Sequence, residues 1–442
     1  MLALGVSRPP RRSRAGRNPP GPARAPPVPA WAACLPCQSH VADRVFRPAA
    51  LGNPRFRLLL PGQVAAVAGE QMFAVAITVS VLQAGGDAVA LGLVLAARGV
   101  TLVVFLPVGG VWADRLPRQR VLMAAYGLQA FLAAALAVTG TFPIWAAAGA
   151  VLLSGLAEAF VRPAFNALLQ GVLGDHERVS GRSLVSVAIR TGVMAGPAAG
   201  AGVITLSGAG AAYWITAMTF AVAVLALWRA GEPRREPARR ASFVQDVRAG
   251  VAEARQLPWV RAILIFSAVN LMFVIAPTQV LLPVVTTAAF GSPAVYGLAL
   301  TCYGAGGLAG GLITMAWRPR APGAVALTAI ALYAAAPLSL VLAPSPAVIF
   351  LAFAIAGAGV ETYAIHWEVA LQREIPEHLI GRISSFAWLC GFGLMPFGQA
   401  LTGPLAALAG PAAVLASAAA VILLVPPVLL LVRGMPRFRD PP

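Results

Sequence analysis

The sequence contains no lysine, so all 33 of its basic residues are arginines. A P-loop ends in Gly-Lys-Ser or Gly-Lys-Thr, and its lysine contacts the phosphates of the bound nucleotide. Without lysine this motif cannot be present, and we therefore expect no ATP as a partner of this chain.

Cysteine and histidine are also scarce, with four of each. Cys34 and Cys37 form the segment CLPC, and His40 follows three residues later. A structural zinc site needs a full set of four ligands, and no further cysteine or histidine lies nearby. Cys302 and Cys390 fall in apolar stretches, where a small apolar residue is the simpler interpretation. We therefore expect neither a metal nor a cofactor.

Charged residues make up only 11% of the chain and hydrophobic residues 59%, with a mean hydropathy of +0.78. Soluble domains contain markedly fewer apolar residues. A run of about 18 or more apolar residues is long enough to cross a bilayer as a helix. Twelve such runs occur, at residues 58–83, 89–112, 121–140, 143–168, 183–206, 211–229, 261–286, 294–317, 323–343, 346–370, 383–408 and 411–433. The sequence therefore predicts an all-α integral membrane protein with twelve transmembrane helices.

The positions of the arginines predict the orientation of these helices. A net charge of +17 would also suit a nucleic-acid-binding protein, since basic patches bind phosphate. With both termini placed in the cytoplasm, however, every arginine outside a predicted span falls in a tail or an inner loop, as positive-inside topology requires. The arginines within spans and away from their end residues are Arg98, Arg162 and Arg190. We expect a protein of the cytoplasmic membrane, surrounded by lipid, with no nucleic-acid partner.

The predicted spans fall into two sets of six, separated by a charged segment. Residues 1–56 are an Arg/Pro-rich stretch that we expect to be a disordered cytoplasmic tail, either native or translated from upstream of the true start. The other expected parts are a six-helix bundle at 57–229, a cytoplasmic linker with an amphipathic surface helix at 230–260, a second six-helix bundle at 261–433 and a cytoplasmic tail at 434–442.

A repeat relates the two sets of spans. The segment QGVLGDHERVSGR follows the fourth span, and QREIPEHLIGR follows the tenth. Each begins with a glutamine, Gln170 or Gln372, and each continues with an acid, a histidine and Gly-Arg. Glu158 and Glu361 lie 12 and 11 residues before those glutamines. Duplication of a six-helix unit explains this pattern, and internal duplication is typical of secondary transporters.

The link between the second and third spans reads GGVWADRLPRQR, residues 109–120. It resembles the signature loop of the major facilitator superfamily, Gly-x-x-x-Asp-Arg-x-Gly-Arg-Arg/Lys. The matching residues are Gly110, Asp114, Arg115, Arg118 and Arg120. Pro117 replaces the usual second glycine, and the last basic residue is displaced by one. The second half has a weaker copy, GGLITMAWRPR, with Met315 in place of the acid.

The fifth span, RTGVMAGPAAGAG, resembles the Gly-Pro motif of antiporters in that superfamily. The matching residues are Gly192, Gly196, Pro197 and Gly200. The link QREIPEHLIGRISS is similar to the drug- and siderophore-exporting branch with twelve spans, which includes macrolide exporters and the enterobactin exporter. The resemblance covers about residues 55–433. It implies two pseudo-symmetric six-helix bundles around a central cavity, a small-molecule substrate and exchange for protons.

The charged loop also has a direct physical interpretation. Gly110 permits close helix approach, and Asp114 is able to charge-match the N-terminus of the eleventh span near Arg382. Such contacts would form a latch between the halves that breaks on inward opening. Arg118 and Arg120 have a simpler alternative explanation, because topology alone places arginines in inner loops.

Charged residues within spans are costly and usually line a pathway or form pairs. Glu70 and Arg98 lie about halfway along the first and second spans, so they are able to pair. Glu70 is our candidate for a proton-titrating carboxylate, because burial raises the pKa of a carboxyl group and a nearby arginine lowers it. The alternative is a static pair that holds two helices together.

Other polar residues within spans are candidates for the same pathway. Glu158 and Arg162 are four residues apart and predict an intrahelical pair, which Arg190 could join. Glu361 could line the cavity. Asn270, midway along the seventh span, could donate a hydrogen bond to substrate or bond to another helix.

These features predict a monomeric secondary transporter that exports a small amphipathic molecule in exchange for protons. An importer would share the fold. An intramembrane enzyme would need clustered nucleophiles or metal ligands, whereas His366 is the one histidine within a predicted span. A non-transporting partner or sensor would need a further folded domain. The sequence therefore favours transport, although it does not identify the cargo.

Overall fold

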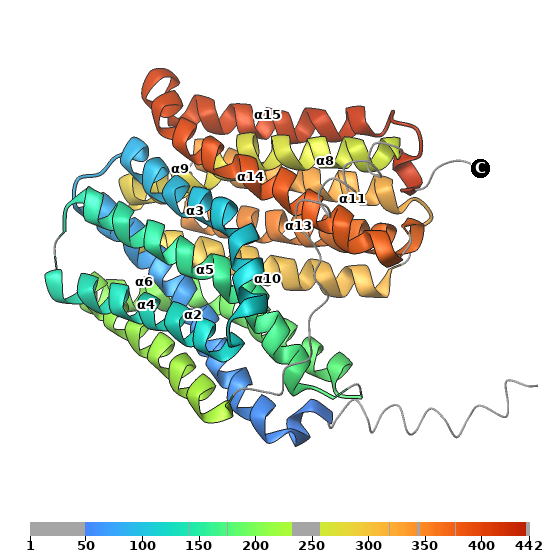
Figure 1. Ribbon diagram of the computed structural model, residues 1–442. Helices are drawn as coiled ribbons and strands as arrows, with labels where there is room; N and C mark the ends of the chain where they lie inside the picture. The colour runs from blue at the N-terminus through green and yellow to red at the C-terminus, as the bar shows by residue number, and fades with distance from the viewer. Residues whose placement is uncertain are drawn as a thin grey trace, which may run out of the picture. The chain divides into compact units, whose positions relative to one another are not determined.

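The computed structural model describes residues 49–140, 142–174, 176–231, 257–317, 319–342, 345–375 and 377–438, without the side chains of 106–115 and 376–392. Every element in these residues is helical (Figure 1). The tail up to residue 48 and the segment 232–256, with its predicted amphipathic helix, lie outside the described residues.

The helices have the following bounds in chain order. They are η2 (Ala49–Gly52), α2 (Pro54–Gln83), α3 (Ala88–Arg115), α4 (Arg118–Thr139), α5 (Ile144–Val172), α6 (Arg178–Ala230), α8 (Pro258–Asn270), η3 (Leu271–Ile275), α9 (Ala276–Phe290), α10 (Pro293–Ala316), α11 (Pro322–Ala331), η4 (Leu332–Ala334), α12 (Ala335–Leu342), α13 (Pro346–Glu374), α14 (Glu377–Ala409), α15 (Pro411–Leu429) and η5 (Met435–Arg437).

Ten helical stretches of the described residues are long and apolar enough to cross a membrane. The longest, α6, has 53 residues and contains one residue outside helical geometry, Gly208. Its φ of 81° is readily adopted only by glycine, so α6 holds two crossings that meet at this residue. With α6 divided in this way, the described residues hold eleven such crossings, and α14, with 33 residues, occupies the place of the remaining predicted one.

The first crossing begins earlier than the sequence predicted. Asn53 caps α2 by accepting hydrogen bonds from the backbone N–H groups of Arg55 at 3.1 Å and Phe56 at 3.4 Å. Pro54 follows in the first turn of the helix. Proline has no backbone N–H, and this is tolerated there because the first N–H groups of a helix have no partner within it. Helix α2 therefore begins within the stretch expected to be a tail, at the Asn-Pro start signal, and η2 precedes that signal.

Two crossings of the second half are interrupted near a proline. The π-helical turn η3 joins α8 to α9, and the 3-10 turn η4 joins α11 to α12. A proline ring clashes with the carbonyl four residues earlier, which belongs to Phe273 for Pro277 and to Tyr333 for Pro337. Both carbonyls lie within the interrupted turns, so the sequence explains where the regular helix gives way.

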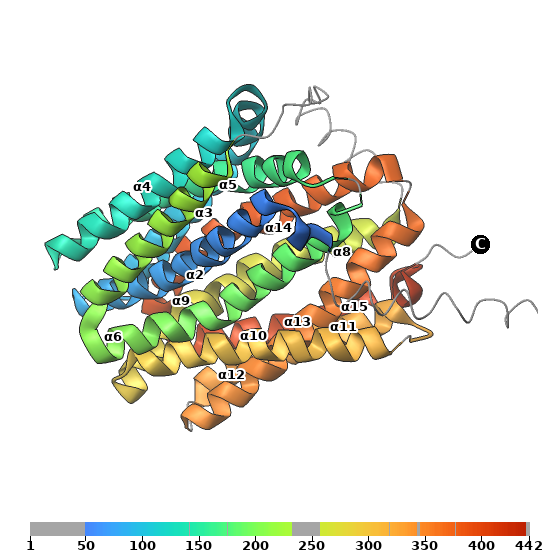
Figure 2. The same cartoon turned by 90° about the horizontal axis from the view of Figure 1, so that it is seen from below.

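The helices pack in two groups that follow chain order (Figures 1 and 2). In the first group, α2 and α4 pack along α6, and α3 packs along α5. In the second, α10 and α11 pack along α13, and α12 packs along α15. Two helix pairs make the main connections between the groups, α3 with α14 and α6 with α10.

Glycines allow both connecting pairs to approach closely. A Cβ atom on Gly92 of α3 would overlap the carbonyl oxygen of Gln399 of α14. On the other pair, a Cβ on Gly297 of α10 would lie 2.8 Å from the carbonyl oxygen of Pro197 of α6. Gly92 and Gly297 lie near the starts of α3 and α10, far along the helices from the loop arginines. We call the end where α2, α4, α6, α8 and α11 begin the arginine-rich end.

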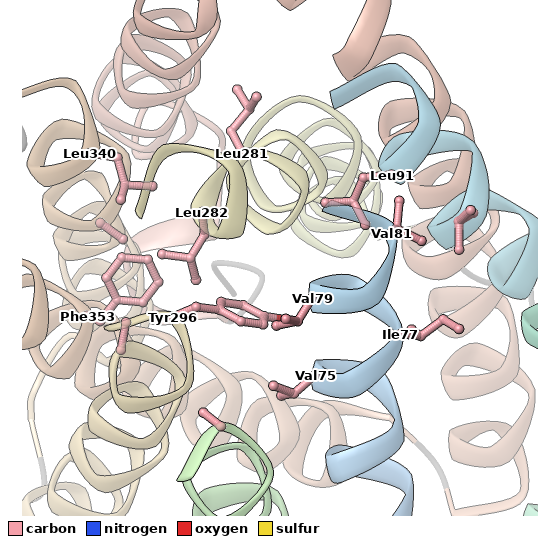
Figure 3. Close-up of a cluster of buried hydrophobic side chains, with 14 of the residues drawn as sticks. Val75, Ile77, Val79, Val81, Leu91, Leu281, Leu282, Tyr296, Leu340 and Phe353 are labelled. Atoms are coloured by element: carbon pink, nitrogen blue, oxygen red, sulfur yellow. The ribbon is translucent and has the colours of Figure 1, made fainter. Parts of the chain in front are cut away.

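The buried apolar side chains divide differently at the two ends of the helices. One large cluster joins both halves, and Figure 3 shows Val75 and Val79 of α2 beside Leu282 of α9 and Tyr296 of α10. At the arginine-rich end, the described apolar side chains form two separate clusters, one entirely within residues 50–230 and one entirely within 257–438. Among the described side chains, which do not include those at the arginine-rich ends of α3 and α14, the hydrophobic core shared by the halves lies away from the arginine-rich end.

The residues after α15 fold back onto the second half, although the sequence predicted a tail from residue 434. Phe438 is fully buried, with its ring centroid 5.6 Å from that of Trp259 and 6.3 Å from that of Trp367. Arg373 donates a hydrogen bond to the carbonyl oxygen of Arg437 at 3.1 Å. This aromatic clasp, Phe438 with Trp259 and Trp367, ties the chain end to α8 and α13.

Candidate functional site

Four charged side chains within the crossings of the first half lie together. Arg98 of α3 donates from Nη2 to Glu70 Oε1 of α2 and, at 2.8 Å, to Glu158 Oε2 of α5. Its Nε donates to the same oxygen of Glu158 at 3.1 Å. Arg162 Nη2 lies 3.8 Å from Glu158 Oε1. We refer to Glu70, Arg98, Glu158 and Arg162 as the charge cluster.

A glycine allows α5 to reach Arg98. A Cβ on Gly155 would lie 2.7 Å from the backbone oxygen of Arg98, so the two helices touch through backbone atoms at this point. Glu158 lies three residues after Gly155 and therefore on the same face of α5. The sequence thus places the Glu158 carboxylate next to the Arg98 guanidinium.

The two carboxylates of the charge cluster are held unequally. Glu158 receives two N–H groups from Arg98, and its side chain is only 8% exposed. Glu70 receives one N–H group, and its side chain is 27% exposed. The pairing of Glu70 with Arg98, considered from the sequence, is thus present, but Arg98 is shared with a second and more deeply buried acid.

From the sequence, Arg190 was a candidate to join Glu158 and Arg162. In the structure it pairs with a different carboxylate. Its Nη1 donates to Glu361 Oε1 of α13, in the other half of the chain. The side chain of Arg190 is 60% exposed and that of Glu361 is 20% exposed. Among the ion pairs of the described residues, this is the one that joins a residue before the linker to a residue after it.

Asn270 is 6% exposed at the end of α8, directly before the π-helical turn. Its Oδ1 atom has no hydrogen-bond partner among the described atoms. Single π-helical turns within helices occur frequently at functional sites. A Cβ on Gly398 of α14 would overlap the carbonyl oxygen of Met272 in this turn, so α14 packs directly on it.

The Gly-Pro motif of α6 packs against α2. A Cβ on Gly192 would lie 2.7 Å from Val67, and a Cβ on Gly196 would lie 2.5 Å from Gln71. Further along, a Cβ on Gly200 would approach the α2 backbone. The carbonyl of Pro197, by contrast, faces Gly297 of α10. The motif therefore lies where α6 meets both its own half and the other half.

The signature loop is shorter than expected, because α3 continues to Arg115 and α4 begins at Arg118. Arg118 Nη1 donates to the carbonyl oxygen of Ala167 at 2.8 Å, which ties the loop to α5. Arg120 is exposed. The side chains of Gly110, Asp114 and Arg115 lie outside the described residues, so their place in a latch stays a prediction.

The sequence analysis missed a polar contact at the arginine-rich end of the first half. Asn53 Nδ2 donates to the Val172 carbonyl at 2.9 Å and to Glu177 Oε2 at 3.1 Å. The backbone N–H of Gly174 donates to the same Glu177 oxygen at 3.0 Å. These two donors hold the pKa of Glu177 below its ordinary value of 4.5. The Asn-Pro pair at residues 53–54 is a sequence signal for the start of a helix, and it was the feature from which the position of Asn53 could have been predicted.

Comparison with known proteins supports the fold and the family. The chain is 29% identical to the multidrug efflux pump Tap of Mycolicibacterium fortuitum over 368 residues, which are 79% of this chain and 88% of that protein. It is 27% identical to the multidrug efflux pump Tap of Mycobacterium tuberculosis (strain ATCC 25618 / H37Rv) over 376 residues, 80% of this chain and 87% of that protein.

Solved transporter structures share the fold. The nucleoside transporter NupG matches with a TM-score of 0.66 and 13% identity, over 85% of this chain and 98% of that chain. A bacterial homologue of the iron transporter ferroportin, in its inward-facing state, matches with a TM-score of 0.65 and 14% identity, over 85% and 98% of the two chains. These likenesses confirm the predicted all-α membrane fold.

The sequence profile of the Major Facilitator Superfamily matches residues 59–399, well over half of the chain. This match covers the charge cluster, the Gly-Pro motif and the ion pair between the halves. It confirms the family resemblance inferred from the signature loop, and it identifies a transporter rather than an enzyme. The chain is a multi-pass membrane protein and belongs to the Major Facilitator Superfamily of secondary transporters.

Proposed function

We propose that this chain exports a small amphipathic molecule from the cytoplasm in exchange for protons, by alternating access. The similarity to multidrug efflux pumps supports export and a cargo of this kind. The distribution of arginine supports an arginine-rich end in the cytoplasm, because inner loops retain positive charge.

The observation that carries the proton step is the sharing of Arg98 by two carboxylates. One guanidinium offers its better-placed N–H groups to Glu158, and Glu70 receives a single hydrogen bond. Protonation of Glu70 removes one negative charge and leaves the buried pair of Glu158 with Arg98 intact. Glu70 is therefore the carboxylate that gains and loses a proton at the lower free-energy cost.

In the proposed cycle, the arginine-rich ends of the two halves open to the cytoplasm to admit cargo. Each half has its own hydrophobic cluster of described side chains at that end, which would keep each half packed as it moves. After the halves rock about their shared core, protonation of Glu70 from outside releases the cargo. Deprotonation to the cytoplasm restores the binding form. The cargo would also donate a hydrogen bond to the Oδ1 atom of Asn270, which is buried and has no described partner.

The signature loop would act on the same movement. We propose that Asp114 and Arg115 contact the start of α14 when the halves close at the arginine-rich end, and release it when they open. The bond from Arg118 to Ala167 supports a loop held in place by α5 rather than one free to move alone.

Transport in proteoliposomes tests the proton step. An imposed pH gradient should drive movement of antibiotic or siderophore candidates by the wild-type protein. Glu70→Gln, which keeps the shape of the side chain but cannot titrate, should reduce gradient-driven movement to the level of empty vesicles. Glu368→Gln, at an exposed position of α13, is the matched control and should transport normally.

Gradient-driven transport by Glu70→Gln equal to that of the wild type would remove Glu70 from the mechanism. Movement of cargo in the same direction as protons would instead identify an importer with this fold. Both outcomes are read from the same vesicles.

A further inference from the structure

We infer that Glu361 binds a positively charged group of the cargo, and that Arg190 is the counter-ion that occupies this carboxylate when no cargo is bound. This inference rests on the proposed transport function and specifies the charge of part of its substrate. It is carried by the geometry of the bridge between the halves and by the surface of α10 beside it.

Among the described residues, none from its own half supplies a counter-charge to Glu361. Glu361 lies near the middle of α13, where a carboxylate in a membrane is costly unless it is paired. α10, which packs along α13, contains no charged residue from Pro293 to Ala316. The described partner of Glu361 is Arg190, which reaches it from α6 of the other half.

The bridge is suited to exchange. A single guanidinium nitrogen of Arg190 contacts one oxygen of Glu361, and no other described hydrogen bond reaches this carboxylate. Arg190 is 60% exposed, so it remains solvated on leaving, and Glu361 at 20% exposure remains accessible. Glu158 differs on every count, since it is 8% exposed and receives two N–H groups from one arginine.

The glycines of α10 leave space beside Glu361. Gly306 and Gly310 are needed for packing, because a Cβ on either would press on the backbone of α13. Gly307 and Gly311 are not, because a Cβ on Gly307 would lie 3.9 Å from Glu361 Cβ and one on Gly311 would lie 3.6 Å from Glu361 Cγ. Those are ordinary van der Waals contacts, so at both positions there is room for a further carbon atom beside the stem of the Glu361 side chain.

A cation on the cargo and the guanidinium of Arg190 would compete for the same oxygen atoms. Cargo binding and the bridge between the halves therefore exclude each other. A ligand shifts a conformational equilibrium when it binds one state better than the other. Cargo at Glu361 would thus remove an attraction between α6 and α13, and the empty transporter would restore it.

Equilibrium binding to the purified protein at a fixed pH tests this inference. The probes are radiolabelled tetraphenylphosphonium, a lipophilic cation, and radiolabelled chloramphenicol, which is neutral. Glu361→Gln should weaken binding of the cation about tenfold or more, the loss typical of removing a charged partner, and leave chloramphenicol binding unchanged. Arg190→Gln should tighten cation binding, because the competitor is gone.

Two further variants separate a binding role from a structural one. Gly311→Leu keeps both charges but fills the space beside Glu361, and should weaken cation binding. The double variant Arg190→Glu with Glu361→Arg restores a bridge, so a purely structural pair predicts wild-type binding, whereas the inference predicts altered cation binding. Thermal unfolding of each variant identifies any loss of fold.

The inference is overturned if the wild type does not bind the cation, if Glu361→Gln binds it as well as the wild type does, or if Arg190→Gln weakens its binding. No pH gradient is present in this measurement. A failure of proton-driven export would therefore appear in the vesicle assay alone, with Glu361-dependent binding intact.

Discussion

Glu158 and Glu361 occupy matching places in the repeat, and their neutralisation differs between the two halves. Glu158 is paired within its own half, with Arg98 and Arg162, and is almost fully buried. Glu361 is paired with Arg190 across the halves and is more exposed. A pair within one half keeps its geometry when that half moves as a unit, whereas a pair between halves changes with every movement. Glu158 therefore keeps its partners when the first half moves as a unit, whereas the proposed movement of the halves would change the pairing of Glu361.

The arginine-rich ends of the halves show a similar contrast. In the first half, Asn53 and Glu177 tie the start of α2 to the link between α5 and α6 by hydrogen bonds. In the second half, Phe438 closes on Trp259 and Trp367. The polar contact includes a titratable group, Glu177, whereas the aromatic clasp contains none.

The largest effect should come from removing the arginine of the buried pair. Arg98→Met leaves Glu158 as a buried, poorly compensated charge, so we expect unfolding to become easier by about 3–5 kcal/mol. The matched change in the other half, Arg190→Met, should lower stability by less, because the carboxylate that it leaves behind, Glu361, is 20% exposed whereas that of Glu158 is 8% exposed. Thermal unfolding in detergent, followed by intrinsic tryptophan fluorescence, measures both.

The double variant Arg98→Met with Glu158→Leu should recover part of the stability lost by Arg98→Met, because the most deeply buried carboxylate is then gone and only the more exposed Glu70 and Arg162 have lost a partner. Equal stability of Arg98→Met and Arg190→Met would contradict the contrast between the two pairs.

A smaller effect should distinguish two neighbouring glycines of α10. Gly310→Ala places a Cβ 2.5 Å from the carbonyl oxygen of Ala358, and overpacking of this kind costs about 1–3 kcal/mol. Gly311→Ala makes only ordinary contacts and should leave stability unchanged. Thermal unfolding of the two variants side by side provides the test. A larger loss for Gly311→Ala would mean that the surface beside Glu361 is needed for packing.

The smallest effect concerns pH at the end of α2. Because the pKa of Glu177 is lowered in the folded protein, its contribution to stability is present above the ordinary value of 4.5 and is lost as pH falls through the lowered value. Hydrogen exchange at residues 49–56, corrected for intrinsic rates, should therefore accelerate in acid. Glu177→Gln should exchange faster at neutral pH and show little further change in acid. Acid-induced exchange that persists in this variant would assign the effect to another group.

The sequence predicted the crossings well because each depends on local composition. Even the join within α6 was anticipated, since the predicted fifth and sixth spans end and begin on either side of Gly208. The contact of Glu70 with Arg98 was considered for a similar reason, because residues at equal depth on consecutive crossings are neighbours. These features follow from distances along the chain.

Contacts between distant segments were the part that the sequence could not supply. The placement of Arg190 against Glu361 depends on how α6 and α13 approach across the halves, which no local pattern encodes. The second bond of Arg98, to Glu158, depends on the backbone contact at Gly155. The clasp at Phe438 was missed because a short segment after the last crossing carries no periodic signal.

The join at Gly208 has a practical consequence for labelling this protein. Under the proposed orientation, the fifth and sixth crossings meet on the outer surface with a single non-helical residue between them. An epitope or protease site inserted there would interrupt helical hydrogen bonding on both sides. The gap between Thr139 and Ile144, on the same surface, separates two complete helices and is the better position for an external tag.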